Sequence, residues 1–303
     1  MKQYLELLED ILLHGEERDD RTGVGTISVF GRQLRFKMKD GFPAVTTKKL
    51  SFRAVVSELL WFLEGSSNEH RLAEIKNDNK PYDQLTDKQK NTIWTLNYEH
   101  QGKDLGYSNG ELGPVYGHQW RHWDYQYEEI SGGLGKNGFV DQIQTVIDKI
   151  KNNPMDRRLL VSAWNVAELN RMALPPCHYC FQLYVSGKNK EYLSLMWNQR
   201  SVDFCTGLPF NIASYALLLH IIAKITGKIP LELIGNLGDT HIYKNHIENA
   251  RIQLKRSCHK LPTLKMPEAD YSSLGSFLKS VKTSDFTLEN YVCEGPLKYP
   301  MAV

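Results

Sequence analysis

Residues 181–225 read FQLYVSGKNKEYLSLMWNQRSVDFCTGLPFNIASYALLLHIIAKI. Two short runs rich in aromatic and aliphatic residues precede one long apolar run, which predicts two strands followed by a buried helix. One further strand-like run lies on each side of this stretch. The predicted strands are 159–164, 181–185, 192–197 and 231–234, and the predicted helix is 211–225. Strands outnumber the helices between them, so we expect a mixed α/β (α+β) fold with a largely antiparallel twisted sheet packed against helices.

The segments before this stretch carry their own periodicity. Apolar residues between Tyr4 and Leu12 recur at helical spacing, and residues 26–38 alternate between apolar and polar. These patterns predict an N-terminal helix followed by a hairpin. Residues 51–63 are strongly apolar and residues 139–150 are amphipathic, both with helical spacing, so each predicts a helix that packs on the core.

Residues 76–112 have a different composition, rich in Asn, Asp, Lys, Gln and Gly with scattered apolar residues. We interpret them as a small polar subdomain that faces solvent. The whole chain has 303 residues with 41% hydrophobic residues, enough for one large domain with a sizeable core. We therefore expect a single domain over residues 1–303 with this subdomain at about 76–112.

Charge and cysteine content restrict the class of protein. The 37 Lys and Arg against 35 Asp and Glu give a net charge of +2. This near balance argues against a protein that binds nucleic acid or an anionic membrane through its overall electrostatic field. Residues 1–17 mix acidic and apolar residues, so no secretory signal is expected. The apolar run 212–225 is shorter than the roughly 20 residues that span a bilayer. Five cysteines, an odd number, suggest no disulfide framework, so we expect a reducing cytoplasm.

The most informative short segment is Pro175-Pro176-Cys177-His178-Tyr179-Cys180, which contains a C-x-x-C motif. A redox pair usually places its first cysteine at a helix N-terminus, whereas this motif leads into a predicted strand. A zinc site would need a second pair, and Cys205, Cys258 and Cys293 are isolated. A third interpretation is a single nucleophilic thiolate at Cys177, and a fourth is a small buried hydrophobic residue.

Four arginines could form a phosphate pocket without raising the net charge. They are Arg21, the adjacent pair Arg157 and Arg158, and Arg200. Guanidinium groups bind phosphate bidentately, although each arginine taken singly could equally be a surface or ion-pair residue. Glu58 has apolar neighbours at helical spacing, which places its carboxylate on a buried face. Desolvation there would raise its pKa, as for a general acid or base, and the alternative is a structural Glu paired with an Arg.

Two further polar features suggest ligand recognition. Asn211 lies at the start of the long apolar helix, where it could cap the helix, and its carboxamide offers both a donor and an acceptor. Those groups match the adjacent carbonyl and N–H of a uracil ring, whereas cytosine would suit a carboxylate better. His241 and Tyr243 are two apart, so in an extended segment they project from the same face and could hold a hydroxyl. Such a pair can also be structural.

Together these segments resemble the folate-dependent thymidylate synthase family. The resemblance covers nearly the whole chain, in the family's order, and the insertion at 77–110 is similar to a variant found in some phage synthases. The motifs that carry it are Asp20-Arg21-Thr22-Gly23, Val45-Thr46-Thr47-Lys48, Glu58 to Leu63, Gly113-Pro114-Val115-Tyr116-Gly117, Asp156-Arg157-Arg158, Pro176-Cys177-His178, Gln199 to Asp203, Leu208 to Tyr215, Gly238 to Tyr243 and Met301-Ala302-Val303.

The resemblance implies transfer and reduction of a one-carbon unit from 5,10-methylenetetrahydrofolate to dUMP, giving dTMP and dihydrofolate without a metal. It also implies a homodimer with sheets stacked face to face, in which Arg157 and Arg158 are donated across the interface. The implied partners are thus dUMP, a reduced folate and a second copy of the chain. No membrane and no dedicated nucleic-acid site is expected.

The resemblance also implies roles for individual residues. Catalytic roles fall to Cys177, Glu58, Tyr116, Arg200, Asp203 and Asn211. The residues implied to bind dUMP are Arg21, Arg157, Arg158, Arg200, Ser201, Val202, Asp203, Asn211, His241 and Tyr243. Those implied to bind folate are Lys48, Trp94, Asp203, Gly207, Phe210, Ala302 and Val303.

In this scheme Cys177 adds as a thiolate to carbon 6 of the uracil ring, and Arg200 helps to hold it ionised and contacts phosphate. Glu58 organises water and proton transfer, with Tyr116 near the proton that leaves carbon 5. The C-terminal residues close over the folate and exclude water from a reactive intermediate.

Three departures from the family pattern lie where folate should bind. Many members have an acidic pair and a second Trp after Trp94, where this chain has Thr95-Leu96-Asn97; the usual apolar triplet after Asp203 is Phe204-Cys205-Thr206; and Ser51 replaces an often basic residue. Looser shielding would let water complete the reaction, so dUMP hydroxymethylase is the alternative. A catalytically inactive nucleotide- or RNA-binding relative is a third hypothesis, and Cys177→Ser separates a binder from an enzyme.

Overall fold

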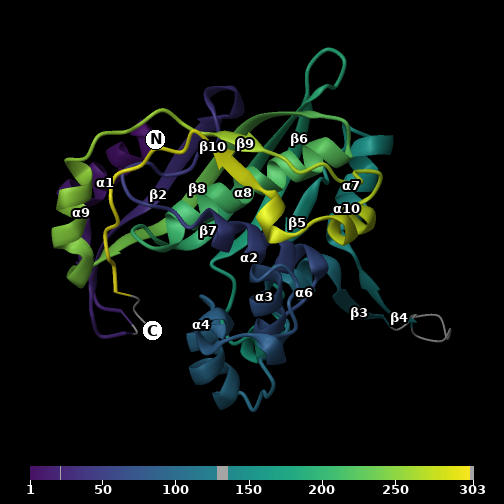
Figure 1. The fold of residues 1–303 in the computed structure, drawn as a ribbon, viewed down its shortest axis with the longest axis horizontal. Helices are drawn as coiled ribbons and strands as arrows, with labels where there is room; N and C mark the ends of the chain where they lie inside the picture. Colours follow the sequence, from purple (N-terminus) through teal and green to yellow (C-terminus); the bar gives the residue numbers. More distant parts are fainter. Residues whose placement is uncertain (21, 128–135, 301–303) are drawn as a thin grey trace. The chain divides into compact units, whose positions relative to one another are not determined.

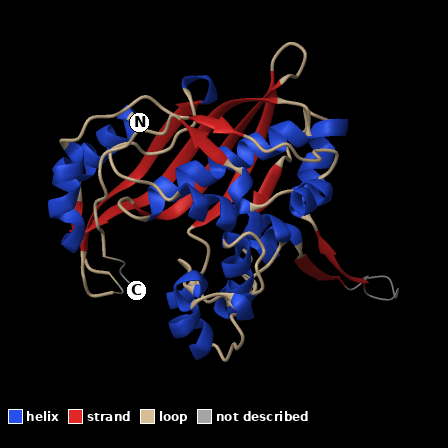
Figure 2. Ribbon diagram, viewed as in Figure 1, coloured by secondary structure: helices blue, strands red, loops and turns tan. Residues whose placement is uncertain are grey.

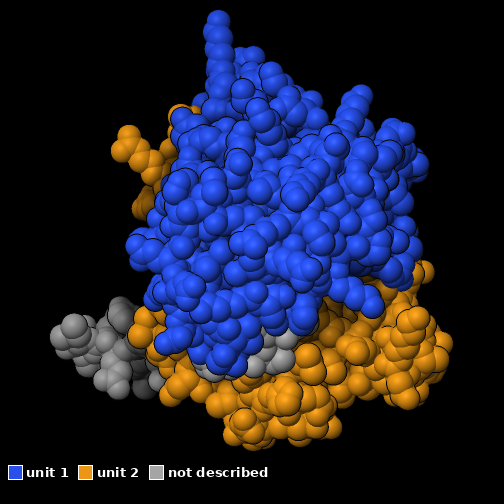
Figure 3. Space-filling model, turned by 90° about the vertical axis from the view of Figure 1, so that its left-hand side faces the viewer, with its two compact units in different colours: residues 1–56, 177–268, 284–303 blue, residues 57–176, 269–283 orange. Residues whose placement is uncertain are grey.

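The computed structural model describes residues 1–20, 22–127 and 136–300. The chain divides into two compact units. Unit 1 comprises residues 1–56, 177–268 and 284–303, and unit 2 comprises residues 57–176 and 269–283 (Figure 3).

Unit 1 contains a sheet in which five of its strands follow the order β1-β2-β8-β7-β6 (Figures 1 and 2). Their bounds are β1 Glu16–Arg18, β2 Thr26–Lys37, β6 His178–Ser186, β7 Tyr192–Asp203 and β8 Ile229–Tyr243. Neighbours are antiparallel except for β7 and β8, which are parallel. A second small antiparallel pair joins β9 Thr263–Lys265 to β10 Thr287–Glu289. The prediction of a mixed, largely antiparallel sheet is confirmed.

The alternating segment 26–38 does not fold back on itself as the predicted hairpin would. It forms the single long strand β2, which pairs with β1 on one side and β8 on the other. A hairpin does exist, but its arms are β1 and the first residues of β2. The alternation is interrupted at Gly31. This glycine has a φ of +72°, which lets the strand continue through an irregular position.

Unit 1 also contains three helices of eight or more residues within the described chain: α1 Lys2–His14, α8 Gly207–Ile225 and α9 Ile247–Leu254. The predicted helix at 211–225 begins earlier, at Gly207, and Thr206 occupies the N-cap position, so the expected cap at Asn211 is wrong. Helix α8 lies against β7 and β8 (Figure 2). Among the helices described, it alone is long and apolar enough to cross a membrane, yet most of it is buried. We therefore interpret α8 as the core helix of this unit.

Helix α2 Phe52–Glu64 begins in unit 1 and continues into unit 2, and it confirms the helix predicted at 51–63. Helix α7 Gln142–Asn152 begins later than the predicted 139–150, because Asp141 accepts from Gln144 N–H as an N-cap and Phe139 and Val140 belong to a strand. Other elements of unit 2 are α3 Glu69–Lys76, α4 Asp87–Lys90, α5 Thr95–Asn97, α6 Tyr116–Arg121, α10 Leu274–Ser280, β3 Trp123–Tyr127, β4 Lys136–Val140 and β5 Leu160–Ser162.

An aromatic cluster forms part of the core of unit 2. Trp61 and Phe62 on α2 pack against Trp94 with ring centroids 5.5 and 6.5 Å away, and Phe62 packs against Tyr116 at 5.0 Å. All four side chains are at most 5% exposed. The turn that carries Trp94 is therefore held by burial of large aromatic surfaces, each worth about 1.5–3 kcal/mol when fully buried.

Candidate active site

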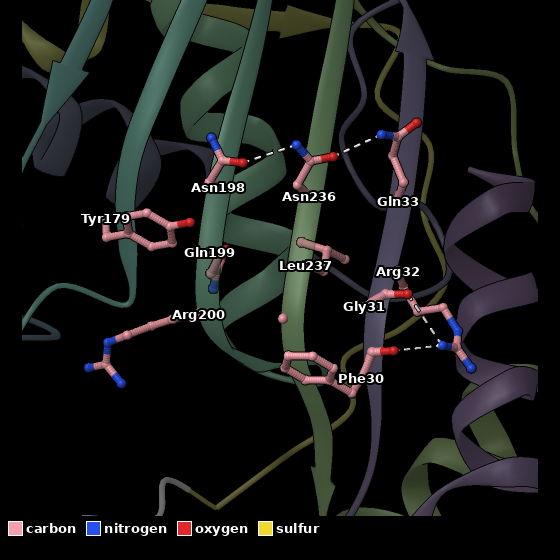
Figure 4. A pocket seen from close by; sticks show the side chains of 11 residues that line it. Phe30, Gly31, Arg32, Gln33, Tyr179, Asn198, Gln199, Arg200, Asn236 and Leu237 are labelled. Carbon is pink, nitrogen blue, oxygen red and sulfur yellow. Dashed lines mark hydrogen bonds between the residues drawn. The ribbon is translucent and has the colours of Figure 1, made fainter.

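Cys177 lies just before β6, where the pairing of β6 with β7 is irregular. The register moves from His178 opposite Gln199 to Cys180 opposite Asn198, so Tyr179 is the extra residue of a β-bulge. The Arg200 N–H donates to the Cys177 carbonyl over 2.8 Å. The bulge thus brings the backbones of Cys177 and Arg200 together, and Figure 4 shows the Arg200 side chain extending away from the strands.

The thiol of Cys177 is in a mixed electrostatic environment. Burial raises its pKa above the ordinary value, the Arg200 guanidinium lowers it, the Asp203 carboxylate raises it, and a hydrogen bond with Ser201 lowers it. Arg200 therefore acts in the direction that we predicted, but burial outweighs it. The neutral thiol is the favoured form at neutral pH.

The structure disfavours two of the interpretations of the C-x-x-C motif. The motif enters a strand and not a helix, so no helix dipole assists a redox pair. The second cysteine, Cys180, instead accepts a hydrogen bond from the Asn198 amide over 3.3 Å. Within the described residues, no three His, Cys, Asp or Glu side chains are grouped so that they could hold a metal ion.

Asn211 is held in one orientation by Gln199, a residue that sequence reasoning did not single out. The buried Gln199 amide donates to Asn211 Oδ1 over 3.0 Å, and it receives a 3.1 Å bond from the Trp197 indole. Because Gln199 occupies one lone pair of Oδ1, the Asn211 N–H₂ group remains a donor and Oδ1 keeps a second acceptor position. The signal that could have identified Gln199 is its position two residues after Trp197, on the same face of a strand, where a polar side chain is buried beside a tryptophan.

The parallel pairing of β7 and β8 sets Asp203 opposite His241. The Asp203 carboxylate accepts from the N–H groups of Cys205 and Thr206 over 3.1 and 3.0 Å, which organises the turn before α8. His241 and Tyr243 have ring centroids 5.3 Å apart, so they share a face of β8 as their spacing predicts. His241 Nδ1 lies 3.3 Å from Asp239, whose other carboxylate oxygen bonds Arg18.

Lys48, predicted to contact folate, is 7% exposed. Its ammonium donates to the Cys205 carbonyl over 2.5 Å and lies 5.0 Å from the centroid of the Tyr299 ring. Burial lowers the pKa of Lys48, while nearby Cys205 and Asp203 raise it. Of the remaining predicted residues in this unit, Val202 is buried, and Ser201, Gly207 and Phe210 are partly exposed close to the start of α8.

Glu58, Trp94 and Tyr116 belong to unit 2. Burial raises the pKa of Glu58 to about 7, as its apolar helical neighbours suggest, while a 2.7 Å hydrogen bond from the Trp94 indole lowers it. Among the described residues, Glu58 accepts its side-chain hydrogen bond from the Trp94 indole, where the structural alternative expected an arginine. A carboxyl group with a pKa near neutrality can both accept and release a proton.

The predicted arginines belong to different parts of the chain. Arg157 and Arg158 are exposed in unit 2, and Arg158 pairs with Asp156 through its N–H and its guanidinium. Arg200 lies in unit 1. Arg21, Ala302 and Val303 lie outside the described residues.

One face of the sheet in unit 1 carries a hollow of about 520 Å³ (Figure 4). An amide ladder crosses three strands there: Gln33 donates to Asn236 over 2.8 Å, and Asn236 donates to Asn198 over 3.0 Å. Phe30 at its border is 80% exposed. This face therefore combines ordered polar groups with an exposed aromatic ring.

The sheet and its helices define a mixed α/β protein with a largely antiparallel sheet. Comparisons with known proteins make the family specific. The family model for thymidylate synthase matches residues 2–303. A probable thymidylate synthase of Escherichia phage T5 is 51% identical over 303 residues, and the thymidylate synthase of Enterobacteria phage T4 is 49% identical over 310 residues, in each case over 100% of both chains.

A solved structure agrees with these relatives. The crystal structure of thymidylate synthase from T4 phage matches with a TM-score of 0.86 at 49% identity, over 100% of each chain. This chain belongs to the thymidylate synthase family. The resemblance inferred from the motifs is thereby confirmed.

Proposed function

We propose that this chain methylates dUMP to dTMP, with 5,10-methylenetetrahydrofolate as the cosubstrate that supplies both the carbon and the hydride. The observation that carries the proposal is the arrangement around the β6–β7 bulge: the backbone of Cys177 bonds that of Arg200 on β7, and the neighbouring Gln199 on β7 donates to Asn211 on α8. Full-length similarity to phage thymidylate synthases supports the same reaction.

The nucleophile in this proposal is Cys177. Its sulfur forms a bond to carbon 6 of the uracil ring, the ring electrons move to carbon 5, and carbon 5 bonds the transferred carbon. Loss of the proton from carbon 5, with breakage of the bond between the transferred carbon and the folate nitrogen, gives an exocyclic methylene group on the ring that is still bound to Cys177. Hydride from the tetrahydrofolate then adds to this methylene as the bond between carbon 6 and sulfur breaks, which gives the methyl group of dTMP, the free thiol and dihydrofolate. Because burial favours the neutral thiol, the attack requires that the thiol lose its proton as dUMP binds, with Arg200 stabilising the negative charge.

Recognition of the base falls to Asn211. Its N–H₂ group would donate to the 4-oxygen of uracil, and its Oδ1 would accept from the ring N–H. Gln199 supports this reading because its donated hydrogen bond fixes which end of the amide is the donor. His241 and Tyr243, adjacent on one face of β8, would hold the deoxyribose hydroxyl.

Phosphate binding is assigned to Arg21, Ser201 and Arg200, with Arg157 and Arg158 supplied by a second copy of the chain. Val202 and Asp203 complete the proposed dUMP set. The exposure of Arg157 and Arg158, and the sheet face with its amide ladder and exposed Phe30, support a homodimer formed by face-to-face sheets.

The proposed folate residues are Lys48, Trp94, Asp203, Gly207, Phe210, Ala302 and Val303. Glu58 is assigned to proton transfer and Tyr116 to the proton leaving carbon 5, and the raised pKa of Glu58 supports its assignment. We further propose that the chain acts as one catalytic domain over residues 1–303 and works in the cytoplasm.

The test mixes the protein with dUMP tritiated at carbon 5 and 5,10-methylenetetrahydrofolate, and follows tritium release and dihydrofolate in one tube. Equal amounts of both are expected for thymidylate synthase. Tritium release without dihydrofolate would mean that water completes the reaction, as in a hydroxymethylase. Cys177→Ser should abolish both signals while dUMP binding persists, and Cys180→Ser, in the same motif, is the matched control that should keep both.

A further inference from the structure

Glu69 is a buried carboxylate at the start of α3, with 2% exposure. Thr92 Oγ1 donates to Glu69 Oε1 over 3.0 Å, and Thr95 Oγ1 donates to the same oxygen. Removing a carboxylate from water is costly unless hydrogen bonds satisfy it, and these two hydroxyls supply such bonds. No local sequence pattern reveals this cluster, because Thr92 and Thr95 lie 23 and 26 residues after Glu69.

The direction of each hydrogen bond follows from the carboxylate, whose oxygens accept. Each threonine hydroxyl gives its one proton to Glu69, which leaves its oxygen free to accept from the backbone. Thr92 Oγ1 accepts from Trp94 N–H over 3.1 Å, and Thr95 Oγ1 accepts from Thr92 N–H over 2.8 Å. The turn 92–95 is thus organised around one buried carboxylate.

This turn carries the tryptophan that bonds Glu58. The Trp94 indole donates to Glu58 Oε1 over 2.7 Å, and its ring packs 5.5 Å from Trp61 and 5.9 Å from Tyr116. The backbone of Trp94 is therefore fixed from the side of Glu69, while its ring is fixed by aromatic packing. A continuous chain of contacts runs from Glu69 to Glu58.

The turn 92–95 contains no acidic residue of its own. In the folded chain an acid nevertheless meets Thr95, because α3 carries the Glu69 side chain that accepts its hydrogen bond.

We infer that Glu69 is a positioning residue for the proposed reaction: through Thr92 and Thr95 it holds the Trp94 indole on the Glu58 carboxyl group. The inference rests on the proposed function for the role of Glu58. The contacts themselves do not depend on that function. Nearby titratable groups are Tyr116 on α6, beside the Trp94 ring, and Tyr82, whose pKa is raised by burial and by the charge of Glu69.

The decisive variants are Glu69→Gln, which keeps the shape of the side chain, and Thr95→Val, which removes one donor. We expect each to lower kcat about 10-fold, a part of the ~10²–10⁴-fold that a positioned acid or base contributes. The limb of the pH–rate profile that belongs to Glu58 should move to higher pH, because the Trp94 bond that lowers the pKa of Glu58 is weakened. The double variant Glu69→Gln/Thr95→Asp, which returns an acid to the turn, should restore both kcat and the position of this limb.

A second readout needs no turnover. The fluorescence of each protein minus that of its Trp94→Phe counterpart, titrated with pH, reports the indole beside Glu58. The midpoint of this pH titration should rise in Glu69→Gln and in Thr95→Val. In the double variant Glu69→Gln/Thr95→Asp it should return to the value of the unaltered protein. If the unaltered protein shows this midpoint but does not turn over dUMP, the proposed function fails while the positioning role stands.

The matched control is Glu111→Gln. Glu111 is also a carboxylate of unit 2 that accepts two side-chain bonds, from Ser67 over 3.2 Å and Asn68 over 2.6 Å, but neither donor belongs to the turn 92–95. Both readouts should be unchanged in this variant. The inference is overturned if the fluorescence midpoint of Glu69→Gln equals that of Glu111→Gln. It is also overturned if the loss of kcat in Glu69→Gln is fully accounted for by a lower free energy of unfolding.

Discussion

The backbone N–H of Arg200 donates a 2.8 Å hydrogen bond to the carbonyl of Cys177. The proposed nucleophile is therefore attached to the strand that carries the proposed phosphate ligand, across the one irregular position of the β6–β7 pairing. The Arg200 guanidinium is also part of the electrostatic environment of the thiol, since its charge lowers the pKa of Cys177.

Arg200→Gln should raise the pKa of Cys177 further, because the charge that lowers this pKa is removed. The measurement is the pH dependence of Cys177 alkylation by iodoacetamide, followed by mass spectrometry of its peptide. The midpoint should move to higher pH, and dUMP should bind about 10-fold more weakly because a charged hydrogen bond is worth ~1.5–3 kcal/mol. Arg35→Gln, an exposed arginine of unit 1 that pairs with Glu232, is the control and should change neither value.

Asn211→Asp should change the base that the protein accepts. A carboxylate cannot donate to the 4-oxygen of uracil but can accept from the amino group of cytosine. We expect kcat/KM for dUMP to fall about 100-fold, the upper range for an unpaired buried polar group, with tritium release appearing from labelled dCMP. Unchanged preference for dUMP would contradict the role assigned to the amide.

Glu58→Gln should change how stability depends on pH. The folded-state pKa of Glu58 is about 7 against an ordinary value of 4.5, so between these values the folded protein binds more protons than the unfolded chain. This group therefore stabilises the fold least above about pH 7, where its buried charge costs up to roughly 3 kcal/mol relative to acid pH.

Urea unfolding at pH 5 and at pH 8 measures this effect. At each pH the free energy of unfolding of Glu58→Gln is compared with that of the unaltered protein. This difference should favour the variant more at pH 8 than at pH 5. The control Glu64→Gln alters an acid on the same helix that pairs with Arg71 on the surface of unit 2. An equal change at both pH values in Glu58→Gln would show that the carboxyl group is not the cause.

Tyr299→Phe should loosen the end of the chain. The Tyr299 hydroxyl donates to Gln253 Oε1 over 2.7 Å, and helix α9 also holds the preceding Lys298 carbonyl through Asn249 over 2.8 Å. The ring additionally lies beneath Lys48. These contacts precede the residues proposed to close over folate, so weakening them should admit water.

The readout for Tyr299→Phe is the ratio of dihydrofolate formed to tritium released, which should fall below one, and Tyr299→Ala should lower it further. A shift of about 1 Å in a reacting group can cost ~10²-fold, so kcat should fall as well. Tyr184→Phe, an exposed tyrosine on β6, is the control. A ratio that stays at one in both Tyr299 variants would argue against a role for this contact in excluding water.

Local sequence was sufficient for much of the fold. The helices at α1, α2 and α8 and the strands β6, β7 and β8 follow from apolar periodicity and strand-like composition, which depend on neighbours a few residues apart. The boundaries were less accurate: α8 begins before Asn211, and α7 begins after Val140 because Asp141 caps it. Boundaries depend on single hydrogen bonds, which periodicity does not report.

Residue chemistry in the sequence also identified candidates for the site. Cys177, Glu58 and Asn211 stood out because each type of side chain was unusual in its local context, and the order of the motifs identified the family. What the sequence could not give was the balance of forces on Cys177. Its pKa depends on burial and on Arg200, Asp203 and Ser201 together, and burial is a property of the folded chain.

Long-range pairing decided the rest. The parallel register that sets Asp203 opposite His241, the bulge that joins Arg200 to Cys177 and the delivery of Glu69 to Thr95 all connect residues far apart along the chain. A local pattern specifies which residues face the core, but it does not specify which strand lies beside which. That choice is made when the core is packed, and it is packing that turns these separate side chains into contacts with defined partners and directions.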